Sequence, residues 1–408
     1  SGSGVVKSKI STIIATFLAL VLSSSPAFAA NETMMDLLKV LRDKGTLTQN
    51  EYELLVNASK ADKEHIEAIK ADTNHSLAKQ LKKAKKAEGW ASKVKVKGDI
   101  RLRYEWQDTD GGIERNRGRY RARIGIIGKP VDNWEAGIGI ASGGDDPRST
   151  NETFDDTFET KDARMDYAYL QYKKDNLMAV GGKFKRKKYL WNATDIMWDG
   201  DVNPEGFAAK YSIKNNLSKF YVGSGILVID EAGGTSEDPY MIYAQLGQKF
   251  KSGNFYGQVA AQYHTFGEMN LGEEHSAGTN TDDNLGAFGT SWELGTKTNL
   301  GKVAFIGDLY NNIETSTNED TAYAVGFKWK KGPWKAKYIY AKVEHNAVPD
   351  FLPDSDRFNG DTGIKGHEFA VGYKVNKKTS LGLDFYATED DDSGVEQEVL
   401  QLDLKYKF

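Results

Sequence analysis

The side chains from residue 93 to residue 408 alternate between apolar and polar with a period of two residues. In the last run, one face carries Leu400, Leu402, Leu404, Tyr406 and Phe408, and the other carries Gln401, Asp403, Lys405 and Lys407. Successive side chains of a β-strand point to opposite faces, so this alternation predicts strands with one apolar and one polar face. About sixteen such runs succeed one another, which predicts an all-β chain.

The connections between these runs alternate in length. Short turns fall at residues 130–133, 174–176 and 376–378, whereas long polar segments fall at 142–162, 186–205 and 346–366. Short turns at one rim and long loops at the other are typical of outer-membrane barrels. A soluble β-sandwich is the alternative for this composition, but it has no need of this alternation. We therefore predict an all-β membrane protein, with a 16-stranded antiparallel transmembrane β-barrel over residues 90–408.

The last predicted strand ends on Phe408. An alternating strand that ends on an aromatic residue resembles the C-terminal signal that barrel-insertion machinery reads. A closed barrel has no free strand edge, so we expect this strand to pair with the first one, residues 93–107. Tyr104, Trp106, Trp134 and Tyr406 are candidates for the aromatic girdles at the two membrane interfaces.

The first 29 residues have the layout of a secretory signal peptide. Residues 1–4, Ser-Gly-Ser-Gly, are expected to be an expression-vector remnant. Lys7 and Lys9 form a positive start, residues 10–22 are mostly apolar, and residues 27–29 read Ala-Phe-Ala, an A-x-A cleavage site. A membrane anchor is the alternative, but the apolar stretch falls short of the roughly 20 residues that a spanning helix needs. We expect cleavage of this segment and export to the outer membrane of a Gram-negative bacterium.

Residues 30–89 are predicted to form a short periplasmic α-helical segment. Leu37, Leu38 and Leu41 recur at helical spacing, and Gly45 ends that pattern. Thr48, with Glu51 three residues later, predicts a capping box at the start of a second helix. The apolar seam is thin, which leaves a trimeric coiled coil and a solvated helix as alternatives.

The composition excludes several classes of function. The chain has no cysteine, which excludes Fe–S clusters, thiolate metal sites and attached c-type haem. A net charge of -4 does not suit nucleic-acid binding. The six histidines lack metal-ligand spacing and no G-x-S-x-G motif is present, so we expect no enzyme, no cofactor and no metal.

Four stretches resemble a family of Gram-negative putative porins, distantly similar to the phosphate-selective porins. They read Lys-Gly-Asp-Ile-Arg-Leu-Arg-Tyr-Glu at 97–105, Asn-Arg-Gly-Arg-Tyr-Arg-Ala-Arg at 116–123, Asp-Asp-Pro-Arg-Ser-Thr-Asn-Glu-Thr at 145–153 and Trp-Asp-Gly-Asp-Val-Asn-Pro-Glu-Gly at 198–206. The resemblance is densest over residues 97–206 and implies a 16-stranded channel that forms a homotrimer. It implies no particular solute, and the acidic run at 389–392 departs from a phosphate-selective pattern.

Selectivity of a channel comes from its width and the charges that line it. The candidate pore-lining basic residues share the polar faces of neighbouring strands: Arg101, Arg103, Arg117, Arg119, Arg121, Arg123, Lys183 and Lys185. We interpret them as an electropositive wall that favours anions. The alternative is a solvated inner face that Asp99, Glu105 and loop acids neutralise.

Residues 186–205 form the candidate constriction loop. Trp191, Met197 and Trp198 suggest that it folds inward, and its acidic residues, Asp199, Asp201 and Glu205, are expected to face the arginines and set up a transverse field. An ordinary extracellular loop is the alternative. In the preceding loop, the acidic residues Asp145, Asp146, Asp155 and Asp156 could bind a divalent cation or bridge lipopolysaccharide, although acid-rich loops are usually only solvated.

Together these patterns predict an outer-membrane porin, a passive diffusion channel for small hydrophilic solutes or ions with an anion preference. The alternative is a structural protein that tethers the envelope through its N-terminal helical segment, motivated by the basic stretch at residues 79–86. A barrel sheath for an electron-transfer protein is disfavoured because it needs a wider barrel. Deleting residues 31–88 separates the first two hypotheses, because only a tether would lose envelope integrity while permeability survives.

Overall fold

The computed structural model describes residues 26–45, 48–87, 93–234, 237–272 and 275–408. It divides into two compact units, residues 1–92 and 93–408. Most of the expected signal peptide, residues 1–25, lies outside the described residues. The expected cleavage site at residues 27–29 falls within the first described helix.

The described part of the N-terminal unit contains helices α2 (Pro26–Asp43) and α3 (Gln49–Ala87), which contact each other. Gly45 comes after α2 with a positive φ of 71°, and its N–H donates to the carbonyl of Arg42. The predicted capping box is confirmed: the Thr48 N–H donates to the Glu51 carboxylate (2.9 Å), and the Glu51 N–H donates to Thr48 Oγ1 (3.4 Å). None of the described helices is both long and apolar enough to cross a membrane.

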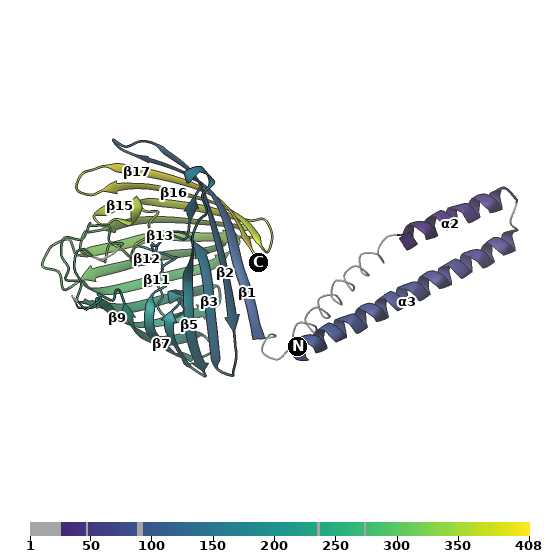
Figure 1. The fold of residues 1–408 in the computed structure, drawn as a ribbon, viewed down its shortest axis with the longest axis horizontal. Helices are drawn as coiled ribbons and strands as arrows, with labels where there is room; N and C mark the ends of the chain where they lie inside the picture. Colours follow the sequence, from purple (N-terminus) through teal and green to yellow (C-terminus); the bar gives the residue numbers. More distant parts are fainter. Residues whose placement is uncertain (1–25, 46–47, 88–92, 235–236, 273–274) are drawn as a thin grey trace. The chain divides into compact units, whose positions relative to one another are not determined.

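The second unit is an antiparallel β-barrel (Figure 1). Sixteen strands form its wall: β1 (Val94–Thr109), β2 (Arg115–Gly128), β3 (Trp134–Ser142), β5 (Ala163–Lys174), β6 (Leu177–Lys183), β7 (Glu205–Lys214), β8 (Ser218–Val228), β9 (Tyr240–Ser252), β10 (Phe255–Gly267), β11 (Gly286–Thr298), β12 (Gly301–Asn312), β13 (Thr321–Lys331), β14 (Trp334–Val343), β15 (Ile364–Lys374), β16 (Thr379–Asp390) and β17 (Glu396–Lys407). The two-residue strand β4 (Glu152–Thr153) is a short addition that pairs with β2. The predicted 16-stranded barrel is therefore confirmed.

Each wall strand pairs with its neighbours in the chain, and the ring closes where β17 pairs with β1. Leu404 lies opposite Leu102, and Asp403 lies opposite Arg103. Beyond the strand end, Phe408 exchanges two backbone hydrogen bonds with Gly98 (3.1 and 3.3 Å). The predicted pairing of the last strand with the first is thus confirmed, and the barrel has no open edge to expose unpaired backbone groups to lipid.

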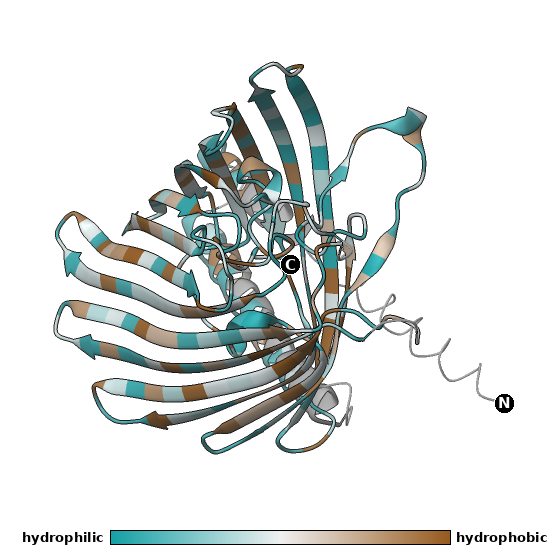
Figure 2. Ribbon diagram, turned by 90° about the vertical axis from the view of Figure 1, so that its left-hand side faces the viewer, coloured by the Kyte–Doolittle hydropathy of each residue, from teal (hydrophilic) through white to brown (hydrophobic). Residues whose placement is uncertain are grey.

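The two faces of the wall differ in polarity, as the alternation predicted. On β1, Ile100, Leu102 and Tyr104 are 45–49% exposed, whereas Arg101 and Arg103 are 6% and 5% exposed. Figure 2 shows the same alternation as teal and brown bands along the strands. The apolar face points outward to lipid and the polar face points into the barrel, which is the arrangement of membrane barrels.

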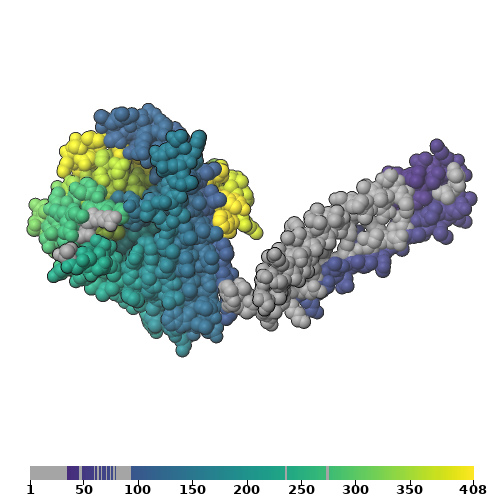
Figure 3. All heavy atoms as spheres, viewed as in Figure 1, coloured from purple at the N-terminus to yellow at the C-terminus, as the bar shows by residue number. Residues whose placement is uncertain are grey.

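The buried core lies inside the barrel, where long connections pack against the inward wall. The β6–β7 connection contributes Tyr189, Met197 and Trp198, and the β14–β15 connection contributes Val348 and Phe351. Blue to teal atoms, the colours of strands β1 to β5, cover much of the barrel face that Figure 3 presents. The long connections therefore position side chains within the lumen instead of only covering its rim.

Gly98 hydrogen-bonds to Phe408 where the barrel closes, so the effect of adding a methyl group there can be predicted. A Cβ built there would lie 2.5 Å from the carbonyl oxygen of Arg123 and 2.3 Å from the Phe408 ring. We expect Gly98→Ala to destabilise the barrel by ~1–3 kcal/mol, because the backbone oxygen cannot move without disturbing the ladder. The measurement is urea unfolding in detergent, with the fraction that migrates as folded barrel in unheated gels. Gly382→Ala is the control, since its Cβ would meet nothing closer than 3.5 Å; equal loss in both variants would contradict the closure argument.

Candidate functional site: the arginine row and the loops inside the barrel

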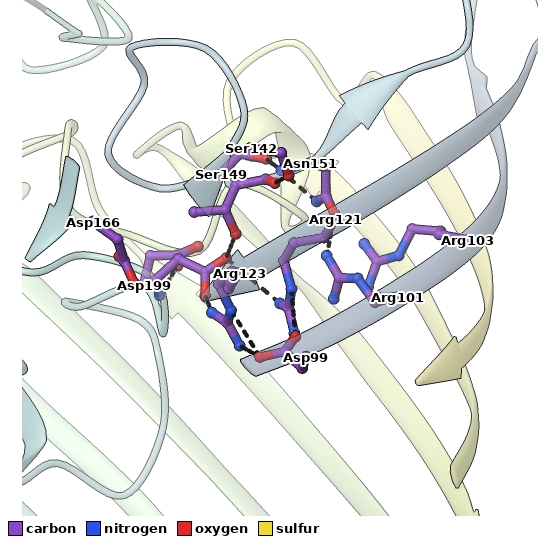
Figure 4. A network of polar contacts seen from close by, with 12 residues as sticks. Asp99, Arg101, Arg103, Arg121, Arg123, Ser142, Ser149, Asn151, Asp166 and Asp199 are labelled. Atoms are coloured by element: carbon purple, nitrogen blue, oxygen red, sulfur yellow. Dashed lines mark hydrogen bonds and ion pairs between the residues drawn. The ribbon is translucent and has the colours of Figure 1, made fainter. Parts of the chain in front are cut away.

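Strands β1 and β2 carry a row of inward-facing arginines, which we call the arginine row: Arg101, Arg103, Arg117, Arg119, Arg121 and Arg123. The antiparallel register sets Arg101 opposite Arg121 and Arg103 opposite Arg119. Like charges directly opposite each other repel across a strand pair. The row therefore depends on carboxylates that lie close to it (Figure 4).

Asp403 on β17 supplies one of these carboxylates. Arg103 donates from Nε and Nη2 to the two carboxylate oxygens of Asp403, at 2.7 and 3.0 Å. This two-bond fork is the strongest arrangement for an arginine and a carboxylate. Arg101 and Lys405 also approach Asp403, at 3.7 and 3.0 Å. Because β17 closes the barrel onto β1, this ion pair lies across the closing seam.

Two further carboxylates come from β1 itself. Asp99 contacts Arg121 at 2.7 Å and Arg123 at 2.9 Å. Glu105, which is 1% exposed, contacts Arg117 and lies 3.1 Å from Arg119. Asp99 and Glu105, which flank Arg101 and Arg103 on one strand face, therefore neutralise much of the repulsion in the arginine row.

The long connections bring two more carboxylates to the arginine row. Asp201 of the β6–β7 connection contacts Arg123 at 3.0 Å and Arg121 at 3.9 Å. Asp356 of the β14–β15 connection lies 3.3 Å from Arg103. Burial opposes ionisation of Asp201, but Arg123, Arg121 and Arg101 outweigh it and lower the pKa of this carboxyl. The wall thus faces loop acids across a short gap, as expected for Asp201.

The β6–β7 connection is held against the inner wall of the barrel by hydrogen bonds. The Trp191 N–H donates to Gln245 on β9 (3.0 Å), and the Tyr189 hydroxyl donates to Gln171 on β5 (2.9 Å). The N–H groups of Ala193 and Thr194 donate to Asp308 on β12, at 3.1 and 2.5 Å. The inward fold suggested by Trp191, Met197 and Trp198 is therefore what the structure has, and the segment crosses the lumen between strands.

The β14–β15 connection interlocks with this segment. The Asp199 N–H donates to the carbonyl of Leu352 (2.7 Å), and the Asp354 N–H donates to that of Asp195 (3.2 Å). Arg357, which is 2% exposed, pairs with Asp195 (3.4 Å) and with Glu368 on β15 (3.0 Å). The two connections therefore form one hydrogen-bonded body inside the barrel.

Asp199 differs from Asp201 although the two are neighbours. Its oxygens accept hydrogen bonds from the N–H groups of Asp201 (2.6 Å) and Ser355 (3.3 Å), and no arginine of the described chain forms an ion pair with it. Burial, together with the charge of Asp201, raises the pKa of Asp199 to about 8. Asp199 therefore joins the two connections as a protonated or partly protonated acid near neutral pH.

The structure places Lys183 and Glu205 away from the arginine row. They pair with each other across β6 and β7 at 3.0 Å. Both share the strand face of Phe207, which is 70% exposed, and not the face of buried Val180. Lys185, by contrast, lies beyond the end of β6 and pairs with buried Asp166 at 3.2 Å. Of the predicted loop acids, only Asp201 meets the arginines directly.

The acidic residues of the β3–β5 connection have a basic side chain among them, that of Lys161. Asp155, Asp156 and Glu159 lie close enough together to share an ion. The Lys161 ammonium contacts Asp155 and approaches Glu159 and Asp156, at 3.2 and 3.8 Å. Asp146 instead pairs with Arg148 at 3.1 Å. Lysine and arginine therefore satisfy most of the acids for which a divalent cation was considered.

Lysines line two cavities toward the short-turn end of the barrel. A cavity of about 1120 Å³ is bordered by Lys93, Lys95, Lys97, Lys129, Lys185, Lys188, Lys407 and Arg123, with four acidic residues. A second cavity of about 480 Å³ is bordered by Lys302, Lys328, Lys330, Lys335, Lys337 and Lys405, with Glu293 and Asp384. Of these residues, only Arg123 and Lys185 were among the predicted pore-lining basic residues. The other lysines that lie on strands occupy inward-facing positions close to the short turns. This position in the alternation is the signal that could have identified them.

Comparison with known proteins places the chain in a family. A family model described as "Putative porin" matches residues 106–327 and 313–408. The chain belongs to this family. The resemblance noted in the sequence is thereby confirmed, and the protein is a porin-like channel of the outer membrane of Gram-negative bacteria. The family and fold point to a channel that is not an enzyme.

Solved structures similar to this chain include OprB of Pseudomonas putida and a porin of Rhodopseudomonas blastica. OprB of Pseudomonas putida, determined at high pH, has a TM-score of 0.55 at 11% identity, with 78% of this chain and 95% of that chain covered. An engineered triple variant of Rhodopseudomonas blastica porin has a TM-score of 0.44 at 11% identity, covering 77% of this chain and 100% of that chain. No protein in the curated comparison set matches. The likeness to OprB shows a shared fold.

The pKa of Asp199 predicts a pH-dependent stability. A carboxyl whose pKa rises on folding holds its proton more tightly in the folded porin, so its contribution to stability falls as pH rises from about 4 to about 8, by at most ~1.4 kcal/mol per pH unit. We expect the unfolding free energy of the porin to fall relative to that of Asp199→Asn over this window. Urea titrations monitored by tryptophan fluorescence between pH 4 and 9 provide the measurement.

The matched control for this experiment is Asp283→Asn, which changes an exposed loop carboxyl. It reports the effect of the same chemical change at an exposed position. A difference between Asp199→Asn and the unmodified porin that does not change with pH would show that Asp199 ionises in the folded porin as it does in the unfolded chain.

Proposed function

We propose that this porin is a passive diffusion channel for small hydrophilic solutes and ions, with a preference for anions. The observation that carries the proposal is the inward positive charge: the six guanidiniums of the arginine row contact five carboxylates, and lysines border both cavities. Fixed charge on the wall of a narrow aqueous path raises the local concentration of counter-ions.

The arginine row and the lysines make different contributions to this preference. Each guanidinium of the row contacts a carboxylate, and the loop acids Asp201 and Asp356 place negative charge close to Arg123 and Arg103. Lys95, Lys97 and Lys407 border the larger cavity and form no ion pair within the described residues. We infer that the row orients polar solutes and that the lysines supply the net attraction for anions.

The loop segment that crosses the lumen supports passive selection by size. It is anchored to β5, β9 and β12 and interlocked with the β14–β15 connection, so it has little freedom to swing away. Selection by a rigid constriction needs no energy source. The interlocked loops would therefore set the size limit, while the wall charges set the sign of the preferred ion.

The proposal predicts the direction of ion selectivity. In a tenfold KCl gradient across a planar bilayer, the reversal potential should have the sign of chloride permeation. Lys95→Glu combined with Lys97→Glu should lower the anion-to-cation permeability ratio several-fold, because it reverses charges that have no carboxylate partner. Charge reversal at Arg119 and Arg121 should also shift selectivity toward cations, since it leaves Glu105 and Asp99 facing new acids.

Lys39→Glu on helix α2 is the control for these reversals, because it reverses the charge of a lysine outside the barrel. Its reversal potential should match that of the unmodified porin. Cation selectivity in the unmodified porin, or lysine reversals that do not change the reversal potential, would refute the anion preference. Neither result would contradict the proposal that the barrel is a diffusion channel.

A further inference from the structure

Arg186 is a buried cation, and two nitrogens of its guanidinium, Nε and Nη2, have no hydrogen-bond partner among the described residues. It is 2% exposed and begins the β6–β7 connection at the short 3-10 turn Arg186–Lys188. Its Nη1 donates to Asn192, whereas Nε and Nη2 form no hydrogen bond with the described residues. The same Nε and Nη2 edge of Arg103 holds both oxygens of Asp403. Arg103 and Arg186 therefore offer the same pair of donors, Nε and Nη2, but only the Arg103 pair binds a carboxylate.

Further buried polar groups near this loop have no hydrogen-bond partner among the described residues. Its guanidinium lies over the Trp198 ring, 4.8 Å from the centroid. The Tyr243 hydroxyl and both ring nitrogens of His264 also form no hydrogen bond with the described residues, although the two side chains are 2% and 0% exposed. Tyr243 and His264 lie directly opposite each other on β9 and β10, with ring centroids 6.5 Å apart. The charge of Arg186 acts on both rings.

The remaining charge near Arg186 does not pair with it. Burial lowers the pKa of Arg186 to about 10, so the guanidinium still carries its charge at neutral pH. Asp308 and Asp199 act on it from a distance, but their oxygens accept hydrogen bonds from Thr194 and Ala193 and from Asp201 and Ser355. A buried charge is stable only when it is paired and hydrogen-bonded, and unpaired buried polar groups are rare in folded proteins.

We propose that a small monovalent carboxylate binds in this place, with its two oxygens on Nε and Nη2 of Arg186 and with hydrogen bonds from Tyr243 and His264. The guanidinium fork matches the planar geometry of a carboxylate. The single guanidinium matches one negative charge, and the nearby acids Asp308 and Asp199 oppose a second one. The aromatic surroundings suit a compact anion such as formate or acetate. The bound anion joins the loop to β9 and β10, beside the Gln245 side chain, which donates to the Trp191 carbonyl and to Gln262.

The test is the stability of the full-length porin in detergent as formate replaces chloride at constant ionic strength and pH. The urea midpoint should rise with formate and saturate. Arg186→Met should abolish the formate effect, and Tyr243→Phe, which removes only one hydroxyl, should weaken the apparent affinity about ten-fold. Arg148→Met is the control, because Arg148 is also buried but already pairs with Asp146. It should keep the full formate effect.

Three outcomes would overturn the proposal. They are a midpoint that does not respond to formate, an equal response to chloride and formate at matched ionic strength, and a formate response in Tyr243→Phe that equals that of the unmodified porin. The last comparison keeps the test decisive if Arg186→Met fails to fold, because Tyr243→Phe preserves the size and the ring of the side chain.

Discussion

The backbone hydrogen bonds between β17 and β1 are the constraint on which the rest of the barrel depends. In lipid, an unpaired N–H or carbonyl has no water to replace its partner, so a sheet can span the membrane only when its first and last strands meet. Here the pairing runs from Thr109 opposite Gln397 to Asp99 opposite Lys407, and Phe408 extends it to Gly98. The same seam brings Asp403 to Arg103, so closure of the backbone also completes the charge pairing of the wall.

The charged side chains inside the barrel come from three parts of the chain. The strands supply the arginine row and some of its acids, the long connections supply Asp201 and Asp356, and lysines supply positive charge toward the short turns. A solvated wall of arginines could exist alone, but a buried wall needs acids within a few ångströms. The interlocked connections meet this need and narrow the lumen at the same time. Structure and selectivity therefore depend on the same ion pairs.

Local periodicity accounts for the parts of the fold that the sequence alone predicted. The strands, their order, the closing pair and the opposed arginines are all consequences of a period of two, because register in an antiparallel sheet fixes the facing residues. The pairing of Arg103 with Asp403 has the same origin, since both lie on polar faces of strands expected to meet. Asp356 could not be predicted, because its place depends on how two connections far apart in sequence dock together.

Lys183, Glu205 and Arg186 show where such predictions stop. Lys183 was assigned to a polar face because of its charge, although it shares the alternation phase of exposed Leu177 on β6 and not that of buried Val180. Arg186 was included only as the first residue of a loop, because burial of a loop residue has no signature in one sequence.

The central claim, that this barrel conducts, is tested most directly by adding the purified porin to a planar bilayer in about 1 M KCl, where charges are screened beyond ~3 Å. The account predicts stepwise conductance increases with a linear current–voltage relation, and insertion without any conductance would contradict it.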